Sequence, residues 1–145
     1  MIETTYKEGA KLVSIKRKIT QDLINCYANV SGDHNPIHIN KEYAKSTKFG
    51  ARIAHGMLNL GIVSEMLQES FQESFQEDWR FEGQIKTKFT APVYSGEVIS
   101  TYGTIISVKP STLIPSITEI QCSIGCKKEN GSIAIEGSAL LKVRA

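Results

Sequence analysis

The chain has 145 residues, of which 41% are hydrophobic and 22% are charged, with a formal net charge of +2. This size and composition are typical of one globular domain, so we expect residues 1–145 to form a single domain. The charge excess is small and scattered, which argues against a nucleic-acid-binding protein.

The first part of the chain predicts one short strand followed by short helices. Residues 11–19 (KLVSIKRKI) alternate polar and apolar side chains over most of their length, as a strand does. Thr20 is a plausible N-cap for a helix over QDLINCYANVS, and Gly32 is a suitable stop. Asn40 can cap a second, brief helix over KEYAKST, and the stretch KFGARIAHG that follows looks irregular.

The only long helix is predicted over residues 57–76. Its apolar residues follow steps of three and four and are Leu60, Val63, Leu67, Phe71 and Phe75. Its end carries an internal repeat, FQESFQED. We expect this repeat to form a solvated helical extension with both Phe side chains facing the body of the protein; a partner-binding face is the alternative.

The second half of the chain is rich in Ile, Val, Thr and Tyr and predicts an antiparallel meander of about four strands. The expected strands cover residues 79–89, 97–108, 113–127 and 132–143. Asn130-Gly131 favours a type I′ hairpin turn between the last two. Since the sheet must bury one face, the sequence predicts an α+β fold in which a curved antiparallel sheet wraps around one central helix. An apolar edge on so small a sheet favours dimerisation.

The cysteines and the N-terminal residues bear on the compartment. Cys26, Cys122 and Cys126 are an odd number without CxxC spacing, so we expect buried thiols and neither a disulfide framework nor a zinc ribbon. The N-terminal residues lack the apolar run of a signal peptide, and no segment reaches membrane-spanning length. We therefore expect a cytoplasmic protein with no membrane partner.

The densest polar motif is SGDHNPIH, residues 31–38. Its simplest interpretation is a polar turn in which Asp33 bonds nearby amides, His34 is exposed and His38 packs against its neighbours. The alternative is catalytic. Pro36 fixes its own φ and restricts Asn35, so a rigid bend can turn Asp33 and His38 toward one point, where an acid and a base hold one water.

A second motif, IAHGM, lies where the long helix begins. The backbone N–H of Gly56 is free of any side chain there, and the helix dipole adds positive potential. This arrangement suits an oxyanion-binding site. An acid/base pair combined with an oxyanion site indicates chemistry beside an activated carbonyl.

SGDHNPIH, ARIAHGML and GQIKTKFTAPVYSGE together resemble the MaoC-like (R)-specific enoyl-CoA hydratases of the hot-dog fold. The resemblance covers most of the chain and is strongest over residues 30–64 and 83–98. It implies a single hot-dog domain, usually paired as a dimer, and reversible syn addition of water to a trans-2-enoyl thioester to give an (R)-3-hydroxyacyl thioester. That activity belongs to fatty-acid or related acyl metabolism.

The resemblance also assigns roles to individual residues. Asp33 and His38 match the catalytic pair that holds and activates water, and Gly56 matches the glycine whose N–H binds the thioester oxygen. Ser64 falls where the family has a polar helix residue near the site. Asn35 supports the loop. His55, next to the oxyanion glycine, is expected to orient the loop or cap the helix.

Two departures from the family pattern concern structure and substrate. Asn40 stands where the family often has Asp, which weakens a supporting hydrogen bond. QESFQESFQEDW replaces the expected Pro/Gly-containing loop, which leaves the length of the acyl chain open.

Two other functions remain open. A hot-dog acyl-CoA thioesterase would need a carboxylate that acts on the thioester carbonyl, and Glu65 is the nearby candidate. A non-catalytic acyl-thioester-binding subunit is the other alternative.

We expect no metal, because Asp33, His34 and His38 lack a recognisable ligand spacing. No cofactor is expected beyond the coenzyme A or acyl-carrier phosphopantetheine of the substrate. The expected partners are that substrate and a second copy of the chain, as a homodimer or a higher oligomer.

Overall fold

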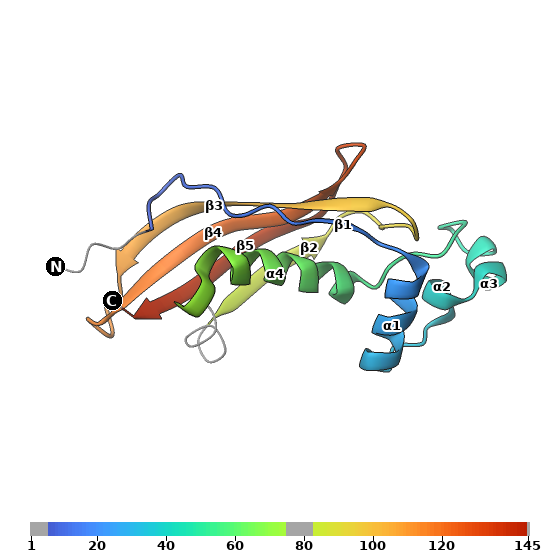
Figure 1. The fold of residues 1–145 in the computed structure, drawn as a ribbon, viewed down its shortest axis with the longest axis horizontal. Helices are drawn as coiled ribbons and strands as arrows, with labels where there is room; N and C mark the ends of the chain where they lie inside the picture. The colour runs from blue at the N-terminus through green and yellow to red at the C-terminus, as the bar shows by residue number, and fades with distance from the viewer. Residues whose placement is uncertain (1–5, 75–82, 145) are drawn as a thin grey trace.

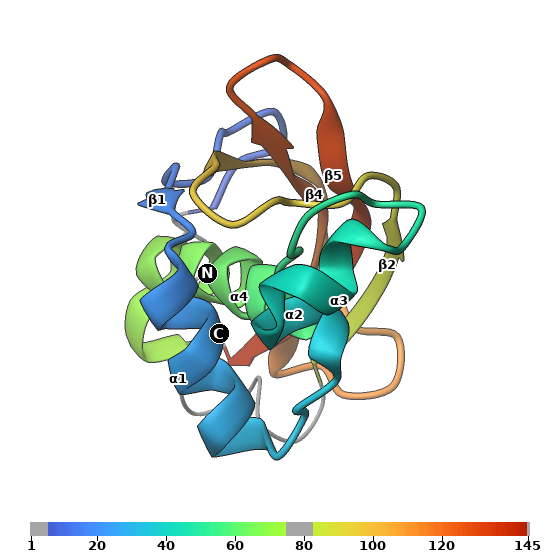
Figure 2. The ribbon, with the colours of Figure 1, turned by 90° about the vertical axis from the view of Figure 1, so that its right-hand side faces the viewer.

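The computed structural model describes residues 6–74 and 83–144. A long helix lies along one face of an antiparallel sheet, and three short helices gather at one end of the molecule, beyond the start of the long helix (Figure 1). Viewed from that end, the strands arch over the long helix (Figure 2). The α+β hot-dog architecture predicted from the sequence is confirmed.

The short helices begin and end where side-chain caps allow. In α1 (Gln21–Ser31), Thr20 Oγ1 accepts a hydrogen bond from Leu23 N at 3.1 Å, and Gly32 ends the helix at φ 78°. Helix α3 (Lys41–Lys45) is capped by Asn40 Oδ1, which accepts from Tyr43 N. Both caps confirm the sequence-based predictions.

Helix α2 (Pro36–Ile39) falls where only a rigid bend was predicted. Asn35 Oδ1 accepts from Ile37 N at 3.1 Å, and Pro36 occupies the first helical position, where its missing N–H costs no hydrogen bond. The motif therefore forms a capped helical turn.

The central helix α4 (Gly56–Ser74) begins one residue before its predicted start, and non-helical backbone at Gln72 interrupts its last turn. Its inward face carries Val63, Met66 and Leu67, which have no exposed surface. Phe71 is also buried, with its ring 5.1 Å from that of Tyr6. Phe75 and the second half of the FQESFQED repeat lie outside the described residues.

The sheet has five strands in the order β1-β3-β4-β5-β2. The strands are β1 (Lys16–Lys18), β2 (Gln84–Phe89), β3 (Val98–Pro110), β4 (Ile117–Lys128) and β5 (Ile133–Arg144). The predicted antiparallel meander is confirmed for β3, β4 and β5 but not for β2. Strand β2 pairs with β5 at the far edge instead of with β3, and β1, much shorter than predicted, forms the other edge.

Strand alternation places the core on the sheet face toward α4. Cys122, Ile124 and Cys126 of β4 are buried, and Ile124 lies opposite Gly137 of β5. Burying these alternating apolar positions against α4 is what fixes the register, because a one-residue slip would expose them all.

The β4–β5 hairpin differs in type from the predicted one. Gly131 N donates to Lys128 O at 3.0 Å, and Gly131 has φ 86°, whereas Asn130 has no positive φ. A type I′ turn requires positive φ at both central residues. The loop is therefore a type I turn followed by a left-handed glycine, and Asn130 contributes its Oδ1 as an acceptor for Ser132 N.

The three cysteines are free, and only two of them are buried as predicted. Burial raises the pKa of the Cys122 thiol to about 12 and that of Cys126 to about 11, while Cys26 is exposed on α1. We expect a water-soluble disulfide reagent at neutral pH to modify one thiol per native chain rapidly and all three after denaturation. Rapid modification of two or three thiols in the native protein would contradict this burial.

No helix within the described residues is long and apolar enough to cross a membrane.

Candidate active site

The loop between α1 and α2 holds Asp33 in a defined conformation. Asp33 N donates to Ser31 Oγ at 3.2 Å, and Asp33 Oδ1 accepts from Asn35 N at 3.2 Å. Asn35 in turn caps α2, which carries His38. Part of the simple-turn interpretation is therefore correct, and the same hydrogen bonds orient the Asp33 carboxylate, whose second oxygen can still accept.

His38 has a defined tautomer. Its Nδ1 lies 2.8 Å from the carbonyl oxygen of Ile53, and a carbonyl only accepts, so Nδ1 carries the proton and donates. The neutral ring therefore keeps a lone pair on Nε2. The side chain is half-buried and lines a cavity, so this nitrogen is available as a base.

His55 connects the two predicted catalytic residues. Its Nε2 lies 3.0 Å from the backbone oxygen of Asp33 and donates to it, and its ring stacks on that of His38 with centroids 3.8 Å apart. The ring of Tyr27, from α1, approaches its other side at 4.8 Å. The side chain is 2% exposed. The hydrogen bond to the Asp33 carbonyl is a contact by which His55 can orient the loop, and its role in orienting the loop or capping the helix stays a prediction.

Burial lowers the pKa of His38, and the nearby His55 lowers it further, whereas the hydrogen bond to Ile53 and the charge of Asp33 raise it. The net shift is downward from 6.5. His38 is therefore neutral, and able to accept a proton, through the physiological pH range.

One candidate ligand atom from each of Asp33, His38 and His55 lies near the separation that a single bridging water can span. Ligand atoms of Asp33, His38 and His55 lie within 4.8 Å of one another. A water that donates two hydrogen bonds of about 2.8 Å spans acceptors about 4.6 Å apart. Asp33, His38 and His55 could also hold a cation. The sequence analysis considered His34 for such a site, whereas the structure places His55 there. The expectation that no metal is needed stays a prediction.

Gly56 is the first residue of α4, so its N–H has no acceptor within the helix. Gly56 lines the same cavity as His38, and a methyl group on it would lie 2.9 Å from Cε1 of Phe89. The glycine therefore lets the Phe89 ring lie against the helix N-terminus. The backbone N–H and the helix dipole together suit a developing negative charge.

The cavity beside this cluster has a volume of about 440 Å³. It lies between the start of α4, the end of β2 and the loop that follows β2. Its walls are mostly apolar, with Phe49, Met57, Phe89, Val93 and Ala134 among them. A mostly apolar cavity with a few polar groups at one end is the usual form of a small-molecule site.

One predicted site residue, Ser64, lies apart from this cluster. Ser64 is half-buried two turns further along α4, about 12 Å from Gly56 by helical rise, and is not among the residues that line the cavity. His34 is exposed, as expected. Sequence reasoning missed Tyr27, the Ile53 carbonyl and Asn59, a buried polar residue of α4 that lines the cavity.

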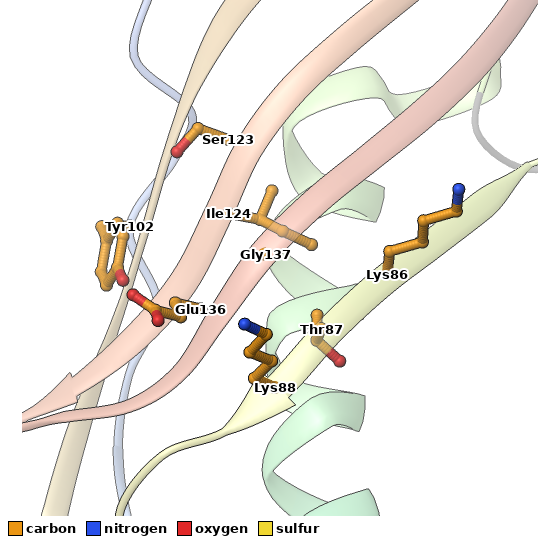
Figure 3. A pocket seen from close by; sticks show the side chains of 8 residues that line it. All are labelled: Lys86, Thr87, Lys88, Tyr102, Ser123, Ile124, Glu136 and Gly137. Carbon is orange, nitrogen blue, oxygen red and sulfur yellow. The ribbon is translucent and has the colours of Figure 1, made fainter.

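A second cavity, of about 470 Å³, lies on the opposite face of the sheet. Figure 3 shows Tyr102, Glu136 and Lys88 around it, with α4 behind the strands. Tyr102, at one side of this cavity, lies over Gly125, where a Cβ would collide with the Ile135 carbonyl oxygen and the Tyr102 hydroxyl. None of the predicted site residues lines this cavity.

The His55 contacts yield a prediction. His55→Phe keeps an aromatic ring in the stack but removes the N–H that holds the Asp33 carbonyl, so we expect turnover to fall roughly 10-fold to 100-fold. Without the charge of His55, the acidic limb of the pH–rate profile should move to higher pH, because that charge lowers the pKa of His38. Steady-state rates between pH 5 and 9 measure both effects.

The matched control is His34→Phe, an exposed position on the same loop. This variant should change neither the turnover rate nor the pH of the acidic limb of the pH–rate profile. If His55→Phe reduced the melting temperature but left the pH limb unmoved, His55 would have only a structural role.

The chain is similar to known proteins over most of its length. The family model described as MaoC like domain matches residues 4–114. An (R)-specific enoyl-CoA hydratase of Rhodospirillum rubrum is 32% identical over 139 residues, which are 96% of this chain and 89% of that protein. A 3-hydroxybutyryl-CoA dehydratase of Methylorubrum extorquens is 29% identical over 89% of this chain and 76% of its own length.

A solved structure supports the fold. The structure titled (R)-hydratase from A. caviae involved in PHA biosynthesis has a TM-score of 0.79 at 20% identity, covering 97% of this chain and 98% of that one. The family model spans more than half of the chain, and the Rhodospirillum rubrum relative is similar over nearly its whole length. The chain therefore belongs to the MaoC-like family of hot-dog proteins.

Proposed function

We propose that this protein is an (R)-specific hydratase of trans-2-enoyl thioesters, acting reversibly as an (R)-3-hydroxyacyl-thioester dehydratase. The main support is the cluster of Asp33 and His38 beside a cavity that begins at Gly56. The two relatives described above carry the names of a hydratase and a dehydratase of this class.

In the proposed mechanism, a thioester carbonyl withdraws electrons from the conjugated alkene and makes C3 electrophilic. Asp33 and His38 hold the water, one of them removes a proton, and the oxygen adds to C3. The N–H of Gly56 stabilises the negative charge that develops on the thioester oxygen, a contribution of about 3 kcal/mol for one such donor. The pair then supplies a proton to C2 from the same face, so water adds syn.

Several finer points belong to the same proposal. Residues 1–145 act as one domain without a cofactor, and the coenzyme A or acyl-carrier pantetheine belongs to the substrate. The working form is a homodimer. Two apolar side chains beside the cavity, Met57 and Phe89, are 58% and 55% exposed, which supports burial against a second copy of the chain. The unpaired edge of β2 supports the same conclusion. Free cysteines, one of them exposed, support a cytoplasmic location.

The thioesterase alternative depends on Glu65, and the structure gives that residue another partner. Arg17 Nη2 donates to Glu65 Oε1 at 2.8 Å, and Glu65 is not among the residues that line the cavity. Its carboxylate is therefore committed to an ion pair away from the proposed reaction site.

Incubation with crotonyl-CoA and with butyryl-CoA distinguishes hydratase activity from thioesterase activity. The hydratase proposal predicts loss of the enoyl-thioester absorbance of crotonyl-CoA and no free thiol from butyryl-CoA. Thiol release from butyryl-CoA without hydration of crotonyl-CoA would support the thioesterase. Binding of both thioesters without any turnover would instead support a non-catalytic binding subunit.

A further inference from the structure

Asn59 is a polar residue in an apolar setting. It lies on α4 three residues after Gly56, lines the same cavity, and is only 4% exposed. Its Oδ1 has no hydrogen-bond partner among the residues that the structure describes. Buried polar groups in native proteins are normally paired, and the carboxamide of Asn59 belongs to a residue that lines the cavity, so a polar group of a bound molecule is a possible partner for it.

The apolar side chains that line the cavity with Asn59 cannot supply that partner, and no hydrogen bond from its side chain to the polar lining residues His38 and Thr90 is found. Ala54, Val93 and Ala134, which line the cavity with it, are all at least 95% buried and have apolar side chains. The Asn59 backbone is also occupied, because its N–H donates to His55 O at 3.3 Å as part of the first helical turn. The side chain is therefore left to interact with whatever enters the cavity.

The place of Asn59 on the helix defines which part of a ligand it would meet. Residues three apart on a helix share a face, so Asn59 stands one turn deeper along α4 than Gly56. If Gly56 N–H holds the thioester oxygen, the acyl chain beyond C3 is the part that extends toward the cavity walls. A hydroxyl group suits a carboxamide because it can both donate and accept.

We propose that Asn59 makes this protein select acyl thioesters whose chain carries a hydroxyl group beyond C3 over plain hydrocarbon chains of the same length. The proposal rests on the proposed hydratase function, because it uses Gly56 to place the thioester. A site that hydrogen-bonds a substrate hydroxyl discriminates against the analogue without it, since the buried polar group is then left unpaired.

The test uses trans-2-hexenoyl-CoA and three derivatives with the hydroxyl on C4, C5 or C6. The ratio of kcat/KM between the best hydroxylated substrate and the plain one is measured for the native chain, Asn59→Leu and Asn59→Thr. We expect a ratio of roughly 5 to 10 for the native chain, which corresponds to the net free energy of one hydrogen bond. Leu fills the space without a polar atom and should bring the ratio to one or below, whereas Thr retains a hydroxyl and should keep part of the preference.

A binding measurement makes the result independent of turnover. Hexanoyl-CoA and its hydroxylated derivatives cannot be hydrated, and calorimetric dissociation constants for them should show the same preference and the same loss in Asn59→Leu. Such a preference in binding would support the role of Asn59 even if no hydration were detected. The absence of hydration would count only against the hydratase function. Equal affinity for plain and hydroxylated chains in the native protein, or a preference that persists in Asn59→Leu, would overturn the role of Asn59.

Discussion

Replacing Asp33 with Asn is expected to lower hydration of a trans-2-enoyl thioester by about 10²-fold to 10⁴-fold, the usual contribution of general acid–base catalysis. The Asn side chain retains an oxygen that can accept from Asn35 N, so the turn of the loop should survive. The carboxylate that holds the water is lost. Steady-state kinetics, with circular dichroism as a check on folding, measures the change.

His38→Gln should produce a loss of similar size, because it removes the lone pair on Nε2. The double variant should be little worse than either single one, since residues that act on one water are strongly non-additive. His34→Gln, one residue from Asp33 but exposed, is the control and should retain turnover. Near-native rates in Asp33→Asn or His38→Gln would remove the pair from the mechanism.

The second large effect is expected at Gly56, and it requires a background that gives the new side chain room. A Cβ on Gly56 would press on the Phe89 ring at 2.9 Å, so Gly56→Ala alone mixes steric and catalytic effects. In Phe89→Ala that obstacle is gone, and Gly56→Pro then removes the N–H. Proline is well tolerated at the first position of a helix. We expect kcat to fall by about 10²-fold to 10³-fold relative to Phe89→Ala, the loss typical of one oxyanion donor.

The matched control is Gly56→Ala in the same Phe89→Ala background, which adds a side chain but keeps the N–H. Its kcat should stay close to that of Phe89→Ala. If the proline and alanine variants were equally active, the backbone N–H of Gly56 would not be an oxyanion donor.

The sequence predicted the parts of the fold that depend on local signals. Thr20 and Asn40 cap helices through side-chain hydrogen bonds to residues three positions away, and Gly32 ends a helix because it adopts a positive φ. These effects are local, so sequence patterns identify them. The long helix and the alternating core positions of β4 follow from periodicity for the same reason. Periodicity does not predict the order of the strands. The pairing of β2 with β5 depends on how the connecting segments run, and neither strand's own pattern shows this.

The same distinction applies to the candidate site. Asp33, His38 and Gly56 were identified from motif and resemblance, and the structure brings them to one cavity or its edge. The stack of His55 on His38 joins residues 17 positions apart on different elements, so no spacing reveals it. The Ile53 carbonyl, which fixes the His38 tautomer, is a backbone group and leaves no mark in side-chain patterns.

Local signals also misled in one place. Asn130-Gly131 is the pair preferred in type I′ turns, yet the hairpin uses three loop residues and needs positive φ only at Gly131. The bulge in the pairing of β4 with β5 next to this loop accommodates the extra residue. A dipeptide preference cannot account for a bulge that depends on how both strands pack against the core.

The most direct test of the central claim is the product formed from crotonyl-CoA in deuterium oxide. NMR and chiral analysis should give (R)-3-hydroxybutyryl-CoA with a single deuterium at C2, placed on the same face as the new hydroxyl group. Asp33→Asn should form this product at least about a hundredfold more slowly. An (S) product, anti addition, or free coenzyme A in place of a hydroxyacyl thioester would contradict syn hydration by Asp33 and His38.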